Sequence, residues 1–261
     1  MLLKLLKYDF RAMWKQFSLI WGAALVLALV NRFGIFMDAD DRAVHLRDSF
    51  ISSVPMFAFM AVLIAMFVIG IIFVVNRFSK GLLGDEGYLM HTLPVRPWQL
   101  VLSKLICGTV TWVGCSAVSF LSALVMLPLN LSDLLRFPLW SEIFRAVMQH
   151  PDMVALVAEF LLMALSAMIQ FIAAIYLAIA IGHLFSRHRR FIGVAAFIGL
   201  YILLMNVYGR VFSVTFIQRI MDIATASTYS SMLTAIAVML VPAALFLAAV
   251  CWILENKLNL E

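Results

Sequence analysis

Charged residues are scarce in this sequence. Only 13% of its 261 residues are Asp, Glu, Lys or Arg, whereas 65% are hydrophobic, and the mean hydropathy is +1.05. Soluble domains are about half apolar and about a quarter charged, so this composition excludes a single water-soluble core. The net charge of +5 is too small and too dispersed to indicate nucleic acid as a partner. The sequence predicts an all-α polytopic membrane protein.

Recognisable chemical motifs are also missing. Cys107, Cys115 and Cys251 lie in apolar runs without metal-ligand or disulfide spacing, so we expect free thiols. The sequence contains neither the phosphate-binding motif GxxxxGK[ST] nor the zinc motif HExxH. His183 and His188 flank a basic turn, where a solvated or lipid-facing role outweighs metal binding. We expect no catalytic residue, cofactor or metal in this chain.

Long apolar runs are what the sequence has in abundance. Six of them are long enough to cross a bilayer, which takes about 20 residues, and no internal repeat or linker separates them. We therefore expect one membrane domain, 1–261, with spans at about 18–37, 51–76, 100–127, 153–182, 190–208 and 229–253.

The basic residues predict the orientation. With the N-terminus in the cytoplasm, 12 of the 19 basic residues, including all six lysines, fall on cytoplasmic segments. This bias agrees with the positive-inside rule. An even number of spans then places both termini in the cytoplasm.

Residues 1–17 have an amphipathic pattern. At 100° per residue, four basic side chains share a narrow arc opposite the apolar ones: Lys4, Lys7, Arg11 and Lys15. This pattern predicts a helix lying in the inner membrane interface, and it is too long and too regular for a secretory signal. Asp9 lies on the apolar side, which indicates that it is paired with a polar neighbour or directed at a partner. Residues 135–148 and 212–223 predict further helices on, or dipping into, the outer leaflet.

Polar residues inside the spans are candidates for a substrate path: Glu159, Gln170 and Asn206. The structural alternative for Glu159 is an interfacial carboxylate that reaches headgroups or pairs with Arg145, and this alternative is favoured. Buried amides such as Gln170 and Asn206 often simply join helices. The segment Gly114-Cys115-Ser116-Ala117 faintly resembles an intramembrane protease motif. However, Ser116 lies about 20 Å deep, whereas the candidate histidine His183 lies at the cytoplasmic end.

The segment 76–104 is the most patterned cytoplasmic connection. Gly84 followed by Asp85 and Glu86 is typical of a helix start, and Pro94 ends the helix. Pro97 suits the first turn of the next span. We therefore expect one short helix over 84–92, beneath the membrane.

The chain resembles the permease subunits of ABC-2 type transporters, close to the small antibiotic- and peptide-export permeases of Gram-positive bacteria. The resemblance rests on KYDFR (7–11), GDEGYL (84–89), TLPV (92–95) leading to Ser103-Lys104, and ENKLNL (255–260), in this order around six spans.

The resemblance implies a type V (G-type) exporter fold in a bacterial cell membrane. Residues 1–17 would be the elbow helix and 212–223 a re-entrant outer element. A coupling helix would dock on a separate ATPase subunit, and that subunit would bind ATP and Mg²⁺. The residues of this chain that would make the contact are Gly84, Asp85, Glu86, Gly87, Tyr88 and Leu89. A second copy or a related permease would complete the transporter, which would export an amphipathic substrate.

A membrane sensor or immunity protein without transport is the main alternative, followed by an intramembrane protease. Composition does not separate the first alternative from a permease. An ATP-binding cassette protein that copurifies with the chain would do so.

Overall fold

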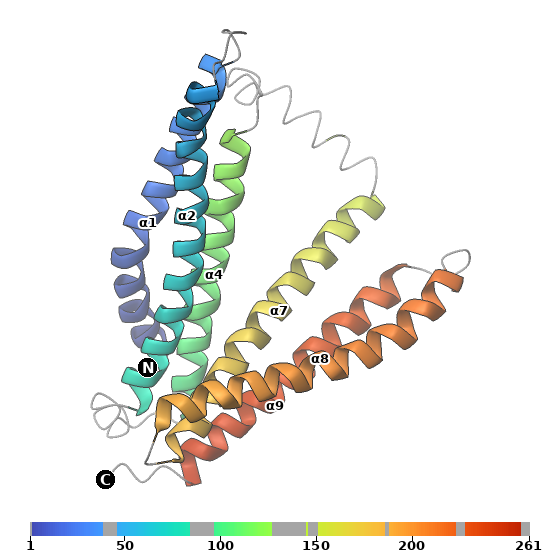
Figure 1. Ribbon diagram of the computed structural model, residues 1–261. Helices are drawn as coiled ribbons and strands as arrows, with labels where there is room; N and C mark the ends of the chain where they lie inside the picture. Colours follow the sequence, from blue (N-terminus) through green and yellow to red (C-terminus); the bar gives the residue numbers. More distant parts are fainter. Residues whose placement is uncertain are drawn as a thin grey trace. The chain divides into compact units, whose positions relative to one another are not determined.

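Long helices make up the regular structure of this chain. The computed structural model describes residues 2–38, 46–83, 97–126, 145, 151–185, 188–222 and 228–256. Within these ranges there is no strand, and the long elements are the helices α1 (Leu2–Asp38), α2 (Leu46–Phe78), α4 (Pro97–Met126), α7 (Pro151–His183), α8 (Arg189–Asp222) and α9 (Thr228–Asn256) (Figure 1). At the end of α2 the chain continues as one short π-helix, η1 (Ser79–Leu83).

Each of the six helices is long and apolar enough to cross a membrane. The candidate spans are Leu6–Arg32, Met56–Gly81, Pro97–Met126, Val157–His183, Phe191–Arg210 and Ile236–Asn256. The number of spans agrees with the sequence analysis, and the bounds of the last five lie within seven residues of their predicted positions. The chain therefore has the architecture of a multi-pass membrane protein.

Contacts group the chain into two compact units. Unit 1 comprises Met1–Leu2, Val74–Thr109 and His150–Glu261, and unit 2 comprises Leu3–Phe73 and Val110–Gln149. The helices α2 and α4 each contribute residues to both units.

Unit 2 consists of α1 with parts of α2 and α4, joined by aromatic side chains. Phe17 of α1 meets Phe73 of α2 edge-on, with ring centroids 5.3 Å apart, and Phe67 of α2 meets Trp112 of α4 at 4.9 Å. Such T-shaped pairs add about 0.5–1.5 kcal/mol to the burial of their area. They connect α2 to each of its two neighbours in this unit.

The contact between α1 and α4 in unit 2 depends on Gly114. A Cβ atom at this position would lie 2.6 Å from Trp21 Cζ2, so only glycine leaves room for the indole ring. The Trp21 Nε1 donates to Cys115 Sγ at 3.5 Å. Near the other end of α1, the buried Arg32 donates from Nη1 to the carbonyl oxygen of Val125 at 2.7 Å, in the last turn of α4.

The core of unit 1 is centred on α7, which packs against α8 and α9. The ring of Tyr176 stacks on Phe78 at the end of α2, with centroids 4.2 Å apart and planes at 13°. Gly108 of α4 lies next to Ile172 and Tyr176, since a Cβ there would be in ordinary van der Waals contact with them, at 3.4 Å and 3.7 Å from their nearest atoms. The residues 172–178 of α7 are all buried.

A tight hairpin joins α7 to α8 within unit 1. A Cβ on Gly182 would lie 2.7 Å from the carbonyl oxygen of Arg189 and 3.0 Å from Gly193 Cα, so the two backbones touch at this glycine. His188 has φ 66°, the left-handed region, and its carbonyl accepts from the Ile192 N–H at the start of α8. This short connection makes the two helices antiparallel neighbours.

Two predicted interfacial elements are not distinguished as separate helices. The helix α1 is unbroken from Leu2 to Asp38, and residues 212–222 continue α8 without interruption. The elbow helix and the outer re-entrant helix therefore stay predictions, and so does the single domain over 1–261. The predicted outer segment 135–148 lies outside the described residues, apart from Arg145.

Candidate functional site: a cavity beside α7 and α8

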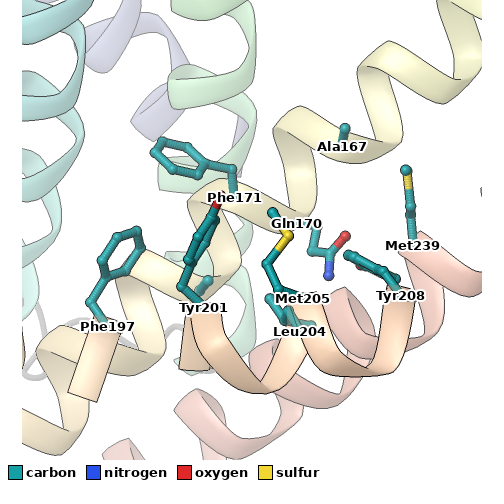
Figure 2. Close-up of a pocket in the computed structure, with 10 residues that line it drawn as sticks. Ala167, Gln170, Phe171, Phe197, Tyr201, Leu204, Met205, Tyr208 and Met239 are labelled. Atoms are coloured by element: carbon teal, nitrogen blue, oxygen red, sulfur yellow. The ribbon is translucent and has the colours of Figure 1, made fainter. Parts of the chain in front are cut away.

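A cavity of about 240 Å³ lies in unit 1, beside α7 and α8 (Figure 2). Almost all of its wall is apolar or aromatic. The lining residues come from α7 (Ala167, Gln170, Phe171, Ala174), α8 (Phe197, Tyr201, Leu204, Met205, Tyr208) and α9 (Met239). None of these residues carries a formal charge. The wall therefore suits an uncharged, mainly apolar occupant.

Gln170 is the polar centre of this cavity. Its side chain extends from α7 toward Met205 and Tyr208 of α8 (Figure 2). Only 5% of the residue is exposed, and its Nε2 has no hydrogen-bond partner among the described residues. The Tyr208 hydroxyl is a polar neighbour that interacts with this amide as a hydrogen-bonding group, although Gln170 Nε2 makes no hydrogen bond of ordinary geometry to any described residue. Leaving a buried donor without a partner costs about 1–3 kcal/mol, so an acceptor in the cavity would recover free energy.

The cavity opens at α8. Tyr201 and Met205 line it, yet they are 49% and 50% exposed. Both lie within the candidate span Phe191–Arg210. Two further lining residues, Phe171 and Phe197, meet edge-on with centroids 6.0 Å apart. The cavity therefore combines half-exposed lining residues on a span with an aromatic pair.

Glu159 and Asn206, the other two candidates for a substrate path, do not line this cavity. Glu159 is half-buried on α7, and its Oε2 is buried without a hydrogen-bond partner among the described residues. Asn206 is exposed on α8 and donates from Nδ2 to the carbonyl oxygen of Ile202 at 2.8 Å, within its own helix. Gln170 alone of the three reaches the cavity.

A second hollow, of about 360 Å³, lies in unit 2 between α2 and α4. Its lining is Leu63, Met66, Phe67, Trp112, Cys115, Ser116 and Ser119. The two serine hydroxyls donate to carbonyl oxygens of their own helix, Ser116 to Trp112 and Ser119 to Cys115, both at 2.9 Å. These hydroxyls already have hydrogen-bond partners in their own helix. A polar ligand would therefore gain less hydrogen-bonding free energy from them than from Gln170 in the first cavity.

The other predicted site residues fall in two groups. The basic residues Lys7, Arg11 and Lys15 are exposed on α1, whereas Lys4 belongs to α1 but its side chain lies outside the described residues. Asp9 is buried and has a polar or charged neighbour, which agrees with the paired alternative for this carboxylate. The predicted ATPase-coupling residues Gly84–Leu89 lie outside the described residues.

Sequence reasoning missed Tyr208 and Tyr201 as parts of the site. Both stand in the fifth apolar run, where aromatic residues are typical of any membrane span. The spacing of seven residues between them places both on one side of α8, which is the only sequence signal that connects them. Among the described residues, no group of three His, Cys, Asp or Glu side chains could hold a metal ion.

The chain matches no protein-family model, no curated protein and no solved structure.

Proposed function

We propose that this chain is the membrane-spanning permease subunit of an ATP-driven exporter of the ABC-2 type, in a bacterial cell membrane. The ATPase is a separate subunit, and a second permease copy or a relative completes the transporter. The proposal is supported by six candidate spans together with the ordered segments KYDFR, GDEGYL, TLPV and ENKLNL. The exported substrate is an amphipathic molecule such as a peptide or an antibiotic.

The packing around the segment 84–96 is the observation that carries this proposal. On its N-terminal side, Phe78 stacks on Tyr176 of α7, and the chain then takes π-helical geometry over Ser79–Leu83. On its C-terminal side, Gly108 of α4 packs against Ile172 and Tyr176 of α7. Both flanks of the segment are therefore in contact with the same helix. The π-helix supports a functional role for this part of the chain, because π-helical turns are frequent at functional sites.

These contacts offer a route for force within unit 1. An ATPase that closes on ATP must act through an element that touches both itself and the spans. A displacement of 84–96 reaches Phe78 and Gly108, and both contact α7. The same helix carries Gln170, about 1.7 turns from Tyr176. The cavity wall is therefore within reach of the cytoplasmic segment through packed side chains.

The docking surface in this proposal consists of Asp85, Glu86, Tyr88 and Leu89. Asp85 and Glu86 are adjacent acids on a side of the chain dominated by Lys and Arg. A buried aromatic anchor at an interface contributes about 2 kcal/mol or more, which assigns Tyr88 the central role. The exposed Lys7, Arg11 and Lys15 of α1 would hold the anionic inner leaflet, at about 1 kcal/mol for each residue.

Copurification tests the proposal. The tagged chain is extracted from its native membrane in mild detergent, and the associated proteins are identified by mass spectrometry. We expect an ATP-binding cassette ATPase to copurify with the wild type. In the double variant Glu86→Arg with Tyr88→Ala, it should be lost, or its ATP hydrolysis should no longer respond to the permease.

The matched control is Asp85→Asn with Glu86→Gln, which removes the charges and keeps their size and the aromatic anchor. It should retain part of the docking. If the wild-type chain brings down no ATPase, the exporter proposal is wrong and a membrane sensor is the better assignment. If the Arg/Ala variant docks and transports normally, the coupling role of 84–89 is wrong.

A further inference from the structure

The amide of Gln170 indicates which polar group an occupant of the cavity would carry. Its Nε2 is a buried donor, and its residue is 95% removed from solvent. The Tyr208 hydroxyl interacts with the amide without giving Nε2 a hydrogen bond of ordinary geometry, so an oxygen acceptor brought in by the occupant satisfies this donor best. Because no charged residue lines the cavity, a carboxylate or phosphate there would be a buried charge without a counter-ion, which is costly. The acceptor is therefore a neutral oxygen.

The rest of the cavity wall indicates the apolar part of the occupant. Around the amide the cavity is lined by rings and thioethers, chiefly Phe171, Phe197, Met205 and Met239. A volume of about 240 Å³ greatly exceeds the roughly 30 Å³ of one water molecule. It is smaller than the about 300–1,000 Å³ of pockets for drug-sized molecules. The space therefore fits one hydrocarbon chain or ring of an amphiphile, not a whole amphiphile.

From these observations we propose that the cavity binds the acyl group of an amphiphile drawn from the bilayer, with the acyl carbonyl oxygen accepting a hydrogen bond from Gln170 Nε2. The acyl chain lies along the aromatic wall, and it enters past Tyr201 and Met205, which are half-exposed on α8. This inference rests on the proposed function, since it names the substrate chemistry of that exporter. The binding step itself needs only the permease chain.

A pair of photoactivatable lipids tests the carbonyl. The full-length chain is reconstituted in vesicles of phosphatidylcholine and phosphatidylglycerol. The vesicles contain a phosphatidylcholine with a diazirine in one ester-linked acyl chain or its ether-linked counterpart, which lacks the carbonyl. After illumination, labelled peptides of α7 and α8 are quantified by mass spectrometry relative to labelled peptides of α1. We expect the ester probe to label the cavity about three- to tenfold more than the ether probe, the ratio that one hydrogen bond provides.

Variants locate the effect at one side chain. Gln170→Met keeps the length of the side chain and removes the donor, so it should abolish the preference for the ester. Asn206→Leu is the matched control, because it removes an exposed amide of α8 that bonds within its own helix. It should keep the preference. Met205→Trp, at a half-exposed position, fills the entrance and should reduce labelling by both probes. This second variant keeps the inference testable even if Gln170→Met folds poorly.

Two results would overturn the inference. Equal labelling of the wild-type cavity by ester and ether probes would mean that no carbonyl meets Gln170. If Gln170→Met keeps the full preference for the ester probe, the acyl carbonyl oxygen accepts its hydrogen bond from another group and not from Gln170.

The source of the acyl group is distinguished by competition. If an unlabelled N-acyl peptide displaces the ester probe, the cavity takes exported acyl peptides. If it does not, a membrane lipid is the occupant, and the acyl chemistry stands in both cases. Carbonyl-dependent binding without any copurifying ATPase would contradict only the exporter proposal. An ATPase partner without carbonyl-dependent binding would contradict only the ligand chemistry.

Discussion

Buried serine hydroxyls donate within their own helices in both units, but Arg32 of unit 2 and Gln170 of unit 1 differ in how they are satisfied. In unit 2, Arg32 donates to Val125 O, Ser122 donates to Val118 O, and the Trp21 indole donates to Cys115. In unit 1, the amide of Gln170 lines a cavity and its Nε2 has no partner among the described residues. Satisfied polar groups stabilise one packing, whereas an unsatisfied one provides free energy for a ligand. Unit 2 therefore has the properties of a scaffold, and unit 1 contains the candidate site.

The units also differ in what their closest glycine meets. Gly182 of unit 1 lies against backbone atoms of Arg189 and Gly193, and Gly114 of unit 2 lies against the ring of Trp21. A backbone neighbour in a helical hairpin cannot rotate away, but a ring can shift. Substitutions at Gly182 and Gly114, and at the buried polar residues Arg32 and Gln170, should therefore change the free energy of unfolding by graded amounts.

The largest effect is expected for Gly182→Ala. The new Cβ would lie 2.7 Å from the Arg189 carbonyl oxygen, so the α7–α8 hairpin must open. Overpacking costs about 1–3 kcal/mol, occasionally more, and a fixed backbone neighbour places this variant at about 3 kcal/mol. The free energy of unfolding, measured by SDS titration in mixed micelles, should fall by this amount. Gly209→Ala, with no atom within 4 Å, is the control, and equal stabilities of the two variants would contradict the hairpin contact.

Arg32→Met should follow, at about 2 kcal/mol. The substitution removes the charged donor that α1 offers to the Val125 carbonyl oxygen in the last turn of α4, and a hydrogen bond to a charged group contributes about 1.5–3 kcal/mol. The same SDS titration measures the loss. Lys15→Met, at an exposed position of the same helix, should change the free energy of unfolding by less than about 0.5 kcal/mol. If both variants behave alike, Arg32 does not hold α1 to α4.

Gly114→Ala should cost about 1–2 kcal/mol, because Trp21 has to move for the new Cβ. Trp21 also contacts Trp14 and Phe17, with centroids 6.0 Å apart in each pair, so its displacement should be visible in the near-ultraviolet circular dichroism. Gly22→Ala, beside Trp21 in sequence with open space around it, should leave both stability and spectrum unchanged. An unaltered spectrum in Gly114→Ala would show that the ring does not occupy this position.

The smallest effect should have the opposite sign. Gln170→Met replaces an unpartnered amide by an apolar side chain of similar length, so in ligand-free detergent micelles it should stabilise the chain by about 1 kcal/mol. The difference from Arg32→Met, in the same titration, is the sharpest test of the contrast between the units. A loss of stability in Gln170→Met would mean that the amide is already satisfied.

The number and order of the spans could be predicted from the sequence, because hydropathy depends only on composition along the chain. The first span differs most in its start, since α1 runs without a break from Leu2 through the basic residues Lys7 and Lys15. An exposed row of lysines is compatible both with a helix on the membrane surface and with the first turns of a longer helix. Local pattern does not decide where such a helix bends.

The cavity could not be predicted, because it depends on how each helix is rotated about its axis. Gln170 and Asn206 give the same signal in the sequence, an amide inside an apolar run. In the structure one is buried in a cavity wall and the other is exposed and bonded to its own helix. The contacts of Gly182 with Gly193 and of Gly114 with Trp21 are equally invisible, since each joins residues whose meeting is decided by packing between helices.

The π-helical turn at Ser79–Leu83 has a consequence for the register of the chain that follows it. A π-helical turn closes its hydrogen bond between residues five apart, whereas an α-helical turn closes it between residues four apart. The π-helical turn therefore holds one residue more. Deleting one residue, for example Lys80, would let α2 continue as an ordinary α-helix without removing a contact of Phe78 upstream. Because the π-helical turn accommodates the additional residue, the chain beyond it would keep its orientation around the helix axis. We therefore expect this deletion to be tolerated, whereas a single-residue deletion within an α-helical turn of α2 would rotate everything that follows by about 100°.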